Sequence, residues 1–366
     1  MLGLHSPQTG RKGRSTSVAS LLLHPPQLIE DRGNISEAKP VWLHEGHLES
    51  QLWFVRRTQM SEMDRRGFIK LAGLGGGIVF ASSLGLNTLG SVLDYANGYA
   101  GKKVEKDFYF VQLSDTHWGF SGPKVNPDAQ GTLKKAVQVV NSLEEQPDFI
   151  VFTGDLTHTT DDVQVRKDRM AQFKDIVGQL KAPTVHFMAG EHDASLDRGD
   201  AYQQFFGKLN YTFDHKGVHF IVLDNVSDPG AIVGEAQLNW LKADLQQQKP
   251  EARIVVLTHR PLFDLYPDWD WATRDGAAVI DTLMPHKNVT VFYGHIHQEH
   301  HQMTGHIAHH SAKSLMFPLP APGSVPKKAP IPWDASAPYK GLGLRNIEAE
   351  VRQAKYGITE LNLNGG

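Results

Sequence analysis

The stretch Phe108-Tyr-Phe-Val-Gln-Leu-Ser-Asp-Thr-His117 joins an apolar run of strand length to a carboxylate and an imidazole. Four later stretches have the same form, in which an apolar run precedes residue types that bind metals. These stretches are 149–155, 184–193, 253–259 and 289–297. Because polar residues that follow successive strands meet at one edge of a sheet, we expect these side chains to converge.

The side chains expected to converge are carboxylates and imidazoles, which would repel or desolvate one another in a dry cleft. Cations between them remove that conflict. Two divalent ions about 3.5–4 Å apart lower the pKa of a bound water and clamp the attacking and leaving oxygens of a phosphoryl transfer. The pattern therefore predicts a two-metal site that hydrolyses phosphate esters.

The order of these segments resembles the calcineurin-like metallophosphoesterase superfamily. Its pattern is D-x-H, G-D, G-N-H-D/E, a lone H and G-H-x-H, and four of the five segments match outright. The resemblance covers residues 106–312 and is greatest to the cyclic-nucleotide phosphodiesterase-like branch. It implies an α/β fold, a four-layer α/β/β/α sandwich in one catalytic domain, and hydrolysis by a metal-bridging hydroxide.

The resemblance also implies a role for each matching residue. His192 would donate a proton to the leaving group, and Asp155 would bridge two divalent or mixed-valence ions, which could be manganese, iron or zinc. The first ion would be held by Asp115, His117, Asp155 and His297, and the second by Asp155, Glu191, His259 and His295.

Glu191 departs from the family pattern, which has Asn at this position. A carboxylate there favours harder ions such as manganese or iron, if it coordinates. Alternatively, Glu191 acts as a base towards water, or the second ion is lost. In the last case the protein would be a catalytically degenerate metal- or ligand-binding protein on the same scaffold.

Other residues near these segments have two possible roles each. His158 either orients a ligand or contacts substrate, or it lies outside the site. Arg260 either neutralises a phosphate oxygen or, as we expect, forms a surface ion pair. Trp118 either roofs the cleft or belongs to the core, and the histidines between His300 and His310 are expected on an exposed hairpin.

A separate signal lies upstream, at Asp64-Arg-Arg-Gly-Phe-Ile-Lys70, which a weakly apolar, Gly-rich stretch follows. It resembles a twin-arginine export signal and implies contact with that export machinery and a periplasmic or extracellular location. Its glycines and polar residues make it a poor membrane span, so no stable span is expected after processing. The complete lack of cysteine is compatible with that location.

These observations divide the chain into three parts. Residues 1–59 have no sustained period and are expected to be a disordered or wrongly assigned extension before a start at Met60 or Met63. Residues 60–100 form the export segment, and 101–366 form the catalytic domain. Within the domain, the Pro-rich stretch 317–345 is expected to be irregular, either covering the active site or only packing on the sheet.

The charge of the predicted domain favours small substrates. The whole chain has 37 Lys and Arg against 40 Asp and Glu, and without the first hundred residues the net charge is about −5. A nuclease that grips long polyanions needs many basic contacts, so no long nucleic acid is expected as a partner. Small phosphoesters remain, with diesters ranked slightly above monoesters.

Periodicity predicts the other elements of the domain. Amphipathic helices are expected at 131–143, 163–180, 201–206, 235–248 and 276–284. A β-hairpin is expected at 211–223, and a closing edge strand at 356–363.

Overall fold

The computed structural model describes residues 107–363, which contain two β-sheets. The first sheet has the strand order β11-β10-β1-β2-β3, and the second has the order β4-β5-β6-β7-β9-β8. Strands β1, β2 and β3 run parallel, and so do β5, β6, β7 and β9. The first sheet consists of β1 (Phe108–Leu113), β2 (Phe149–Thr153), β3 (Val185–Met188), β10 (Gly343–Glu350) and β11 (Lys355–Asn362). The second consists of β4 (Tyr211–His215), β5 (Val218–Val222), β6 (Arg253–Leu257), β7 (Asn288–Tyr293), β8 (His300–Thr304) and β9 (Ile307–Ser311).

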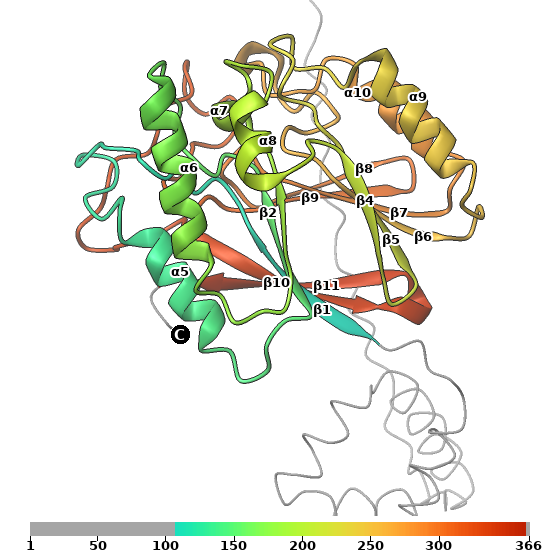
Figure 1. Ribbon diagram of the computed structural model, residues 1–366, viewed down its shortest axis with the longest axis horizontal. Helices are drawn as coiled ribbons and strands as arrows, with labels where there is room; N and C mark the ends of the chain where they lie inside the picture. Colours follow the sequence, from blue (N-terminus) through green and yellow to red (C-terminus); the bar gives the residue numbers. More distant parts are fainter. Residues whose placement is uncertain (1–106, 364–366) are drawn as a thin grey trace, which may run out of the picture. The chain divides into compact units, whose positions relative to one another are not determined.

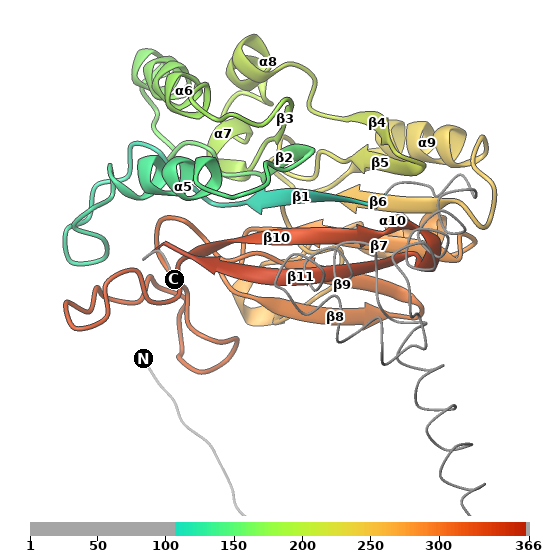
Figure 2. The same cartoon turned by 90° about the horizontal axis from the view of Figure 1, so that it is seen from below.

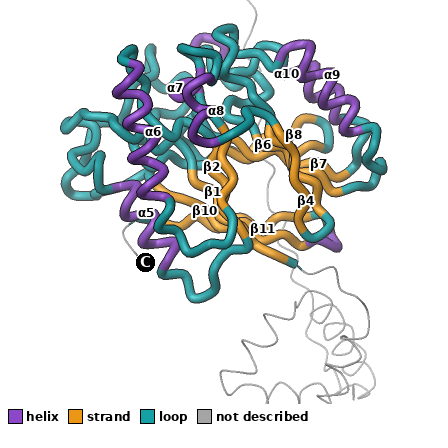
Figure 3. Tube along the Cα trace, viewed as in Figure 1, coloured by secondary structure: helices purple, strands orange, loops and turns teal. Residues whose placement is uncertain are grey.

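Helices cover the outer face of each sheet, as Figures 1 and 3 show. Helices α5 (Thr132–Asn141) and α6 (Val163–Val177) pack on the first sheet, and α9 (Gly234–Leu245) and α10 (Gly276–Leu283) pack on the second. Two short helices, α7 (Glu191–Ala194) and α8 (Asp200–Phe206), follow β3. The expected four-layer α/β/β/α sandwich is therefore confirmed.

Strand β1 shows how the sequence produces two sheets that pack on each other and are covered by helices. Its alternate residues Phe108 and Phe110 face a core shared with Phe220 and Phe292 of the second sheet. Tyr109, Val111 and Leu113 face the core under α5 and α6. A strand buried on both faces reads as a continuous apolar run, and all six residues of β1 are buried.

The predicted helices and strands lie within a few residues of the observed ones, with one exception. The sequence-based prediction has irregular structure up to residue 345, whereas β10 begins at Gly343. It pairs antiparallel with both β1 and β11 (Figure 2), so β11 is the closing edge strand, as predicted.

The predicted extension at 1–59 and the predicted export segment at 60–100 both lie outside the described residues. Among residues 107–363, no helix has both the length and the apolar character needed to cross a membrane.

Candidate metal centre

The candidate ligands lie on turns that follow five strands, three in the first sheet and two in the second. Asp115 and His117 follow β1, Asp155 follows β2, and Glu191 begins α7 after β3. From the second sheet, His259 follows β6, and His295 and His297 follow β7. The two sheets therefore bring these side chains together at their carboxyl-terminal edges.

The backbone of these turns is unusual. Five of the candidate ligands have positive φ angles, namely Asp115 (52°), His117 (41°), Asp155 (50°), His295 (66°) and His297 (54°). Such angles are uncommon outside glycine and cluster at functional sites, because the surrounding structure must compensate for their strain. Hydrogen bonds between the turns supply part of this compensation: Asp115 N–H donates to Gly154 O at 3.1 Å and His117 N–H to Asp155 O at 2.9 Å.

Two glycines allow the turns to approach one another closely. Gly154 has a φ of +90°, and a Cβ there would lie 2.2 Å from Nδ1 of His259. A Cβ on Gly294 would lie 2.1 Å from Ser114 Oγ and 2.8 Å from Asp115 Oδ2. The glycine before a ligand in these motifs is therefore required by the packing of neighbouring ligand turns.

Asp115, His117 and His297 form the first cluster. His117 Nε2 lies 3.1 Å from His297 Nε2, which in turn lies 3.3 Å from Asp115 Oδ1. All three residues are buried. Burial raises the pKa of Asp115, but the nearby positive charge of His297 and His259 outweighs it, so the pKa is lowered and the carboxylate is ionised.

Asp155, Glu191, His259 and His295 form the second cluster. Glu191 reaches both imidazoles, with Oε2 at 2.9 Å from His259 Nε2 and Oε1 at 2.9 Å from His295 Nδ1. Burial opposes ionisation of Glu191, yet the two histidines hold its pKa well below the usual value. The reciprocal effect, from Asp155 and Glu191 against burial, raises the pKa of His259 well above its usual value.

Asp155 lies between the two clusters. Its Oδ2 is 3.6 Å from Nε2 of His117 and 3.4 Å from Nε2 of His259, so one oxygen faces both. The other oxygen, Oδ1, accepts a hydrogen bond of 2.9 Å from the His192 N–H. The backbone thereby orients this carboxylate for a bridging position.

The donor atoms of the second cluster fit a cation. Buried Glu191 Oε2, His259 Nε2 and His295 Nε2 make no hydrogen bond of acceptable geometry within residues 107–363, and the first two face each other only as an ion pair at 2.9 Å. A buried polar atom without a partner is costly, and the convergence of several such atoms is explained by a cation that binds them together.

Backbone carbonyls orient two of the histidines. Nδ1 of His259 lies 2.7 Å from Thr153 O, and Nδ1 of His297 lies 2.7 Å from Phe317 O. A carbonyl can only accept, so Nδ1 of each ring carries a proton. Nε2 is therefore the nitrogen that can release its proton and offer a lone pair to a metal ion.

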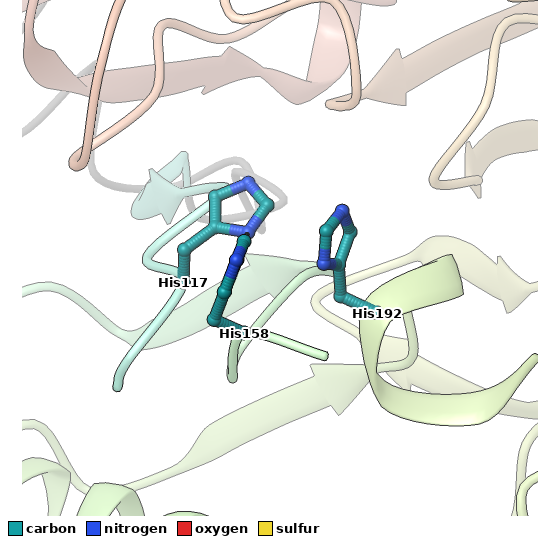
Figure 4. Close-up of side chains that lie close together, drawn as sticks. All are labelled: His117, His158 and His192. Atoms are coloured by element: carbon teal, nitrogen blue, oxygen red, sulfur yellow. Dashed lines mark hydrogen bonds between the residues drawn. The ribbon is translucent and has the colours of Figure 1, made fainter. Parts of the chain in front are cut away.

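His192 and His158 lie beside the first cluster, next to His117 (Figure 4). The Thr159 N–H donates to His192 Nδ1 at 3.2 Å, which leaves the ring proton on Nε2, 4.0 Å from Asp155 Oδ2. The His158 ring stacks on that of His192 with centroids 4.9 Å apart, and its Nδ1 is 3.4 Å from Nδ1 of His117. Burial, with the charge of His192, lowers the pKa of His158 to about 4.

Asp193 is a site residue that the sequence-based analysis did not assign a role. It accepts hydrogen bonds from the backbone N–H groups of Gly190, Leu156 and Thr157, which lie on the turns after β3 and β2. Burial and the charge of Asp155 raise its pKa to about 6. Its position in Gly190-Glu-His-Asp193 marked it, but its partners are visible only in three dimensions.

Two expectations about neighbouring residues are wrong in part. Arg260 forms the expected ion pair, with the exposed carboxylate of Asp270 at 3.8 Å, but it is itself only 7% exposed and its guanidinium also donates to Ala272 O and Asp270 O. The hairpin of β8 and β9 is as predicted, but His309 on it is fully buried. His309 pairs with Val291 of β7 and lies with it on the helix-covered outer face of the second sheet, against Phe263. A run of several histidines in the sequence does not show which of them will be buried. Trp118 belongs to the core under α5 and α6.

Comparison with known proteins gives a consistent result. Residues 108–299, more than half of the chain, match the family of calcineurin-like phosphoesterases. The chain is 31% identical over 192 residues to serine/threonine-protein phosphatase CPPED1 of Danio rerio, a match that covers 46% of this chain and 61% of that protein. It is 30% identical over 206 residues to a probable cyclic nucleotide phosphodiesterase of Rhodococcus erythropolis, covering 52% and 64%.

A third relative is a cAMP/cGMP dual specificity phosphodiesterase of Mycobacterium tuberculosis, 30% identical over 213 residues, with 54% of this chain and 64% of that protein covered. The match thus spans less than two thirds of each of these relatives. The five ligand-bearing turns lie within the matched residues, and the chain belongs to the calcineurin-like phosphoesterase family.

Proposed function

We propose that this protein is a binuclear metal-dependent phosphoesterase that hydrolyses small phosphodiesters or phosphomonoesters. The observation that supports this most is the position of Asp155 Oδ2, 3.6 Å and 3.4 Å from a histidine of each cluster. The names of the relatives, a phosphatase and cyclic nucleotide phosphodiesterases, support phosphoester substrates of both kinds.

Different residues of the chain would bind the two ions and protonate the leaving group. Asp115, His117 and His297 would hold one ion, Glu191, His259 and His295 the other, with Asp155 shared. When bound, two such cations supply an activated water and neutralise the charge of phosphoryl oxygens. The remaining task is to protonate the leaving group. His192 is placed for it, because its Nε2 proton faces the site.

The second cluster favours a hard divalent or trivalent ion. Glu191 adds a second carboxylate to Asp155 beside two imidazoles, and carboxylate oxygens suit manganese and iron better than softer ions. We propose manganese or iron in this position, with zinc as the alternative. Metal analysis of the protein purified from cells grown with each metal tests this proposal.

Small substrates suit the charge of the domain. The net charge of about −5 after the first hundred residues argues against a protein that grips a long polyanion through many basic contacts. Within the family, the relatives named as cyclic nucleotide phosphodiesterases support the corresponding branch as the nearest functional analogue. A cyclic nucleotide, a nucleotide and a glycerophosphodiester are therefore the first substrates to compare.

We also propose that the twin-arginine motif exports the folded protein. Export of a folded chain is compatible with a metal site assembled from five separate turns, since the ions can be inserted before transport. The test is cell fractionation of the full chain and of a variant with both Arg65 and Arg66 changed to Lys. Accumulation of the unchanged chain in the cytoplasm would contradict export.

The alternative function is a degenerate binding protein in which Glu191 has spoiled the second site. The distances of 2.9 Å from Glu191 to His259 and His295 favour a working ligand instead. The variant Glu191→Asn distinguishes the two. Loss of an existing activity supports a working Glu, whereas activity that appears only in the variant supports the degenerate alternative.

The direct test of the function is hydrolysis of bis(4-nitrophenyl) phosphate and 4-nitrophenyl phosphate by metal-stripped protein reloaded with manganese. We expect turnover that requires metal with at least one of the two esters. Absence of turnover with both, in a sample shown to bind two ions, would overturn the proposal.

A further inference from the structure

The Pro-rich segment begins in contact with the metal centre. The Phe317 ring stacks on His117 with centroids 5.3 Å apart and lies 4.6 Å from the ring of His297. Further along, Pro320 O accepts a hydrogen bond from Gln298 Nε2 at 2.7 Å, and the Trp333 N–H donates to Lys124 O at 2.9 Å. The segment is thus attached to loops of both sheets, and its first residue, Phe317, contacts two of the candidate ligands.

Lys328, on this segment, places its ammonium on the buried aromatic cluster beside the second group of ligands. Its Nζ lies 5.7 Å from the ring centroid of Trp271, which is 1% exposed. Trp271 packs on Trp269 with Tyr293 and Ile296, the last of which lies between His295 and His297. A cation over an indole face is held by the ring's quadrupole, so the position of the ammonium is defined.

Arg260 holds in place the loop whose Trp271 ring lies under the ammonium of Lys328. Its guanidinium donates to the carbonyls of Asp270 and Ala272, on either side of Trp271. Arg260 directly follows the candidate ligand His259, so the loop that carries Trp271 is tied to the metal centre. Arg260, for which phosphate binding was the alternative to a surface ion pair, therefore uses its guanidinium to hold this loop.

The charge of Lys328 acts on the second cluster. Glu191 and Asp270 attract its ammonium, and Arg260 repels it. Although the residue as a whole is exposed, burial of its ammonium end against the aromatic cluster is the main cause that lowers its pKa.

Within residues 107–363, no hydrogen bond or salt bridge joins this ammonium to another group. Nearby carboxylates have other partners, because Glu191 contacts two histidines and Asp270 faces Arg260 and Arg274.

A lysine on a Pro-rich loop is ordinarily a solvated surface group, and the neighbouring Lys327 fits that description. Lys327 is exposed and has no described contact with a ring or an acidic group in the part of the chain described here. Lys328 differs in three respects: its ammonium lies over a buried indole, is partly desolvated, and has no hydrogen-bond or salt-bridge partner within residues 107–363 while it interacts electrostatically with the candidate metal ligand Glu191. A partly desolvated cation without a partner is suited to an anionic ligand.

We infer that Lys328 is a substrate-binding residue that favours phosphoesters carrying two negative charges over singly charged diesters. The inference rests on the proposed function. A phosphomonoester has an additional anionic oxygen at neutral pH, and a cation beside the second cluster stabilises that extra charge more than it stabilises a monoanionic diester. The segment that covers this side of the centre would therefore shift selectivity towards monoesters without taking part in the bond cleavage.

The test compares the manganese-loaded protein with its variants Lys328→Ala, Lys328→Arg and the matched control Lys327→Ala. For Lys328→Ala we expect KM for 4-nitrophenyl phosphate to rise about 5- to 10-fold and KM for bis(4-nitrophenyl) phosphate less than about 2-fold, with kcat little changed. Lys328→Arg should retain most of the selectivity, and Lys327→Ala should match the unchanged protein. Equal changes for both esters, or the same change in Lys327→Ala, would overturn the inference.

A binding measurement separates failure of this inference from failure of the proposed function. Titration calorimetry with inorganic phosphate needs no turnover. Lys328→Ala should weaken the Kd for phosphate about 5-fold or more relative to Lys327→Ala. If neither ester is hydrolysed but this difference is found, the proposed activity fails and Lys328 is still an anion-binding residue. If phosphate binds both variants equally, the inference about Lys328 is wrong whatever the activity.

Discussion

We predict that the buried imidazole of His309 makes the folded protein lose stability in acid. It lies on β9 with no exposed surface, packs edge-on against the Phe263 ring at 5.2 Å, and has no hydrogen-bond partner for either ring nitrogen within residues 107–363. Burial lowers its pKa from the ordinary 6.5 to about 4. The folded protein therefore holds a neutral imidazole, whereas the unfolded chain protonates it below pH 6.5.

The sign and size of the effect follow from this difference. A lowered pKa in the folded state contributes stability that is fully present above pH 6.5 and is lost as the pH falls towards 4. Between pH 8 and pH 5 the loss from His309 alone is about 2 kcal/mol. The variant His309→Leu fills the same apolar site and cannot titrate, so it should lack this part of the loss.

Urea unfolding of the metal-free protein at pH 8 and pH 5 measures the effect. Metal-free samples avoid a contribution from metal release in acid. His186 and His158 also have pKa values lowered to about 4, and they remain in both proteins, so they do not affect the comparison. The pKa of His310 is lowered mainly by burial, and the charge of His309 is the smallest of its four causes, so its contribution changes little. If the difference in unfolding free energy between unchanged protein and variant is the same at both pH values, His309 is not held neutral and the reasoning is refuted.

Three further predictions concern the site and its support. His192→Ala should reduce kcat about 100-fold or more for an alkyl phosphoester but far less for a 4-nitrophenyl ester, whose leaving group needs no proton; an equal loss for both would exclude a proton donor. Glu360→Gln should destabilise the protein by about 3–5 kcal/mol, because Arg345 is fully buried and its Nη2 lies 2.6 Å from Glu360 Oε1. The double variant with Arg345→Met should regain most of this in urea unfolding, and a double variant no more stable than Glu360→Gln would contradict the assignment. Gly294→Ala should weaken metal binding at least about 10-fold in a chelator competition, since its Cβ would lie 2.1 Å from Ser114 Oγ and displace the Asp115 turn; unchanged affinity would show that the turn tolerates a side chain.

The fold was predictable because its main signals are local. Runs such as Phe108–Leu113 are apolar except for Gln112 and lead directly into a polar turn, so both the strand and its end can be read from the sequence. Strand β10 was missed because it follows a Pro-rich stretch and its side chains alternate less clearly, and its pairing with β1 joins residues more than two hundred positions apart. Such pairing leaves no local pattern.

The candidate ligands were also predicted together, and the structure brings all seven into two adjoining clusters. Residues that act through position rather than chemistry were not predictable. Arg260 resembles a surface arginine until its bonds to the carbonyls of Asp270 and Ala272 are known. Lys328 lies far from every ligand motif in sequence, and only the path of the loop brings its ammonium to Trp271.

Metal content tests the central claim most directly. The unchanged protein and Asp155→Asn should be stripped, reloaded with excess manganese, freed of unbound metal and analysed for ions per chain alongside hydrolysis of both nitrophenyl esters. Because Asp155 Oδ2 faces a histidine of each cluster, we expect two ions in the unchanged protein and one or none in the variant, with turnover lost. Two ions retained in Asp155→Asn, or fewer than two in an unchanged protein that hydrolyses the esters at full rate, would contradict a bridged two-metal centre.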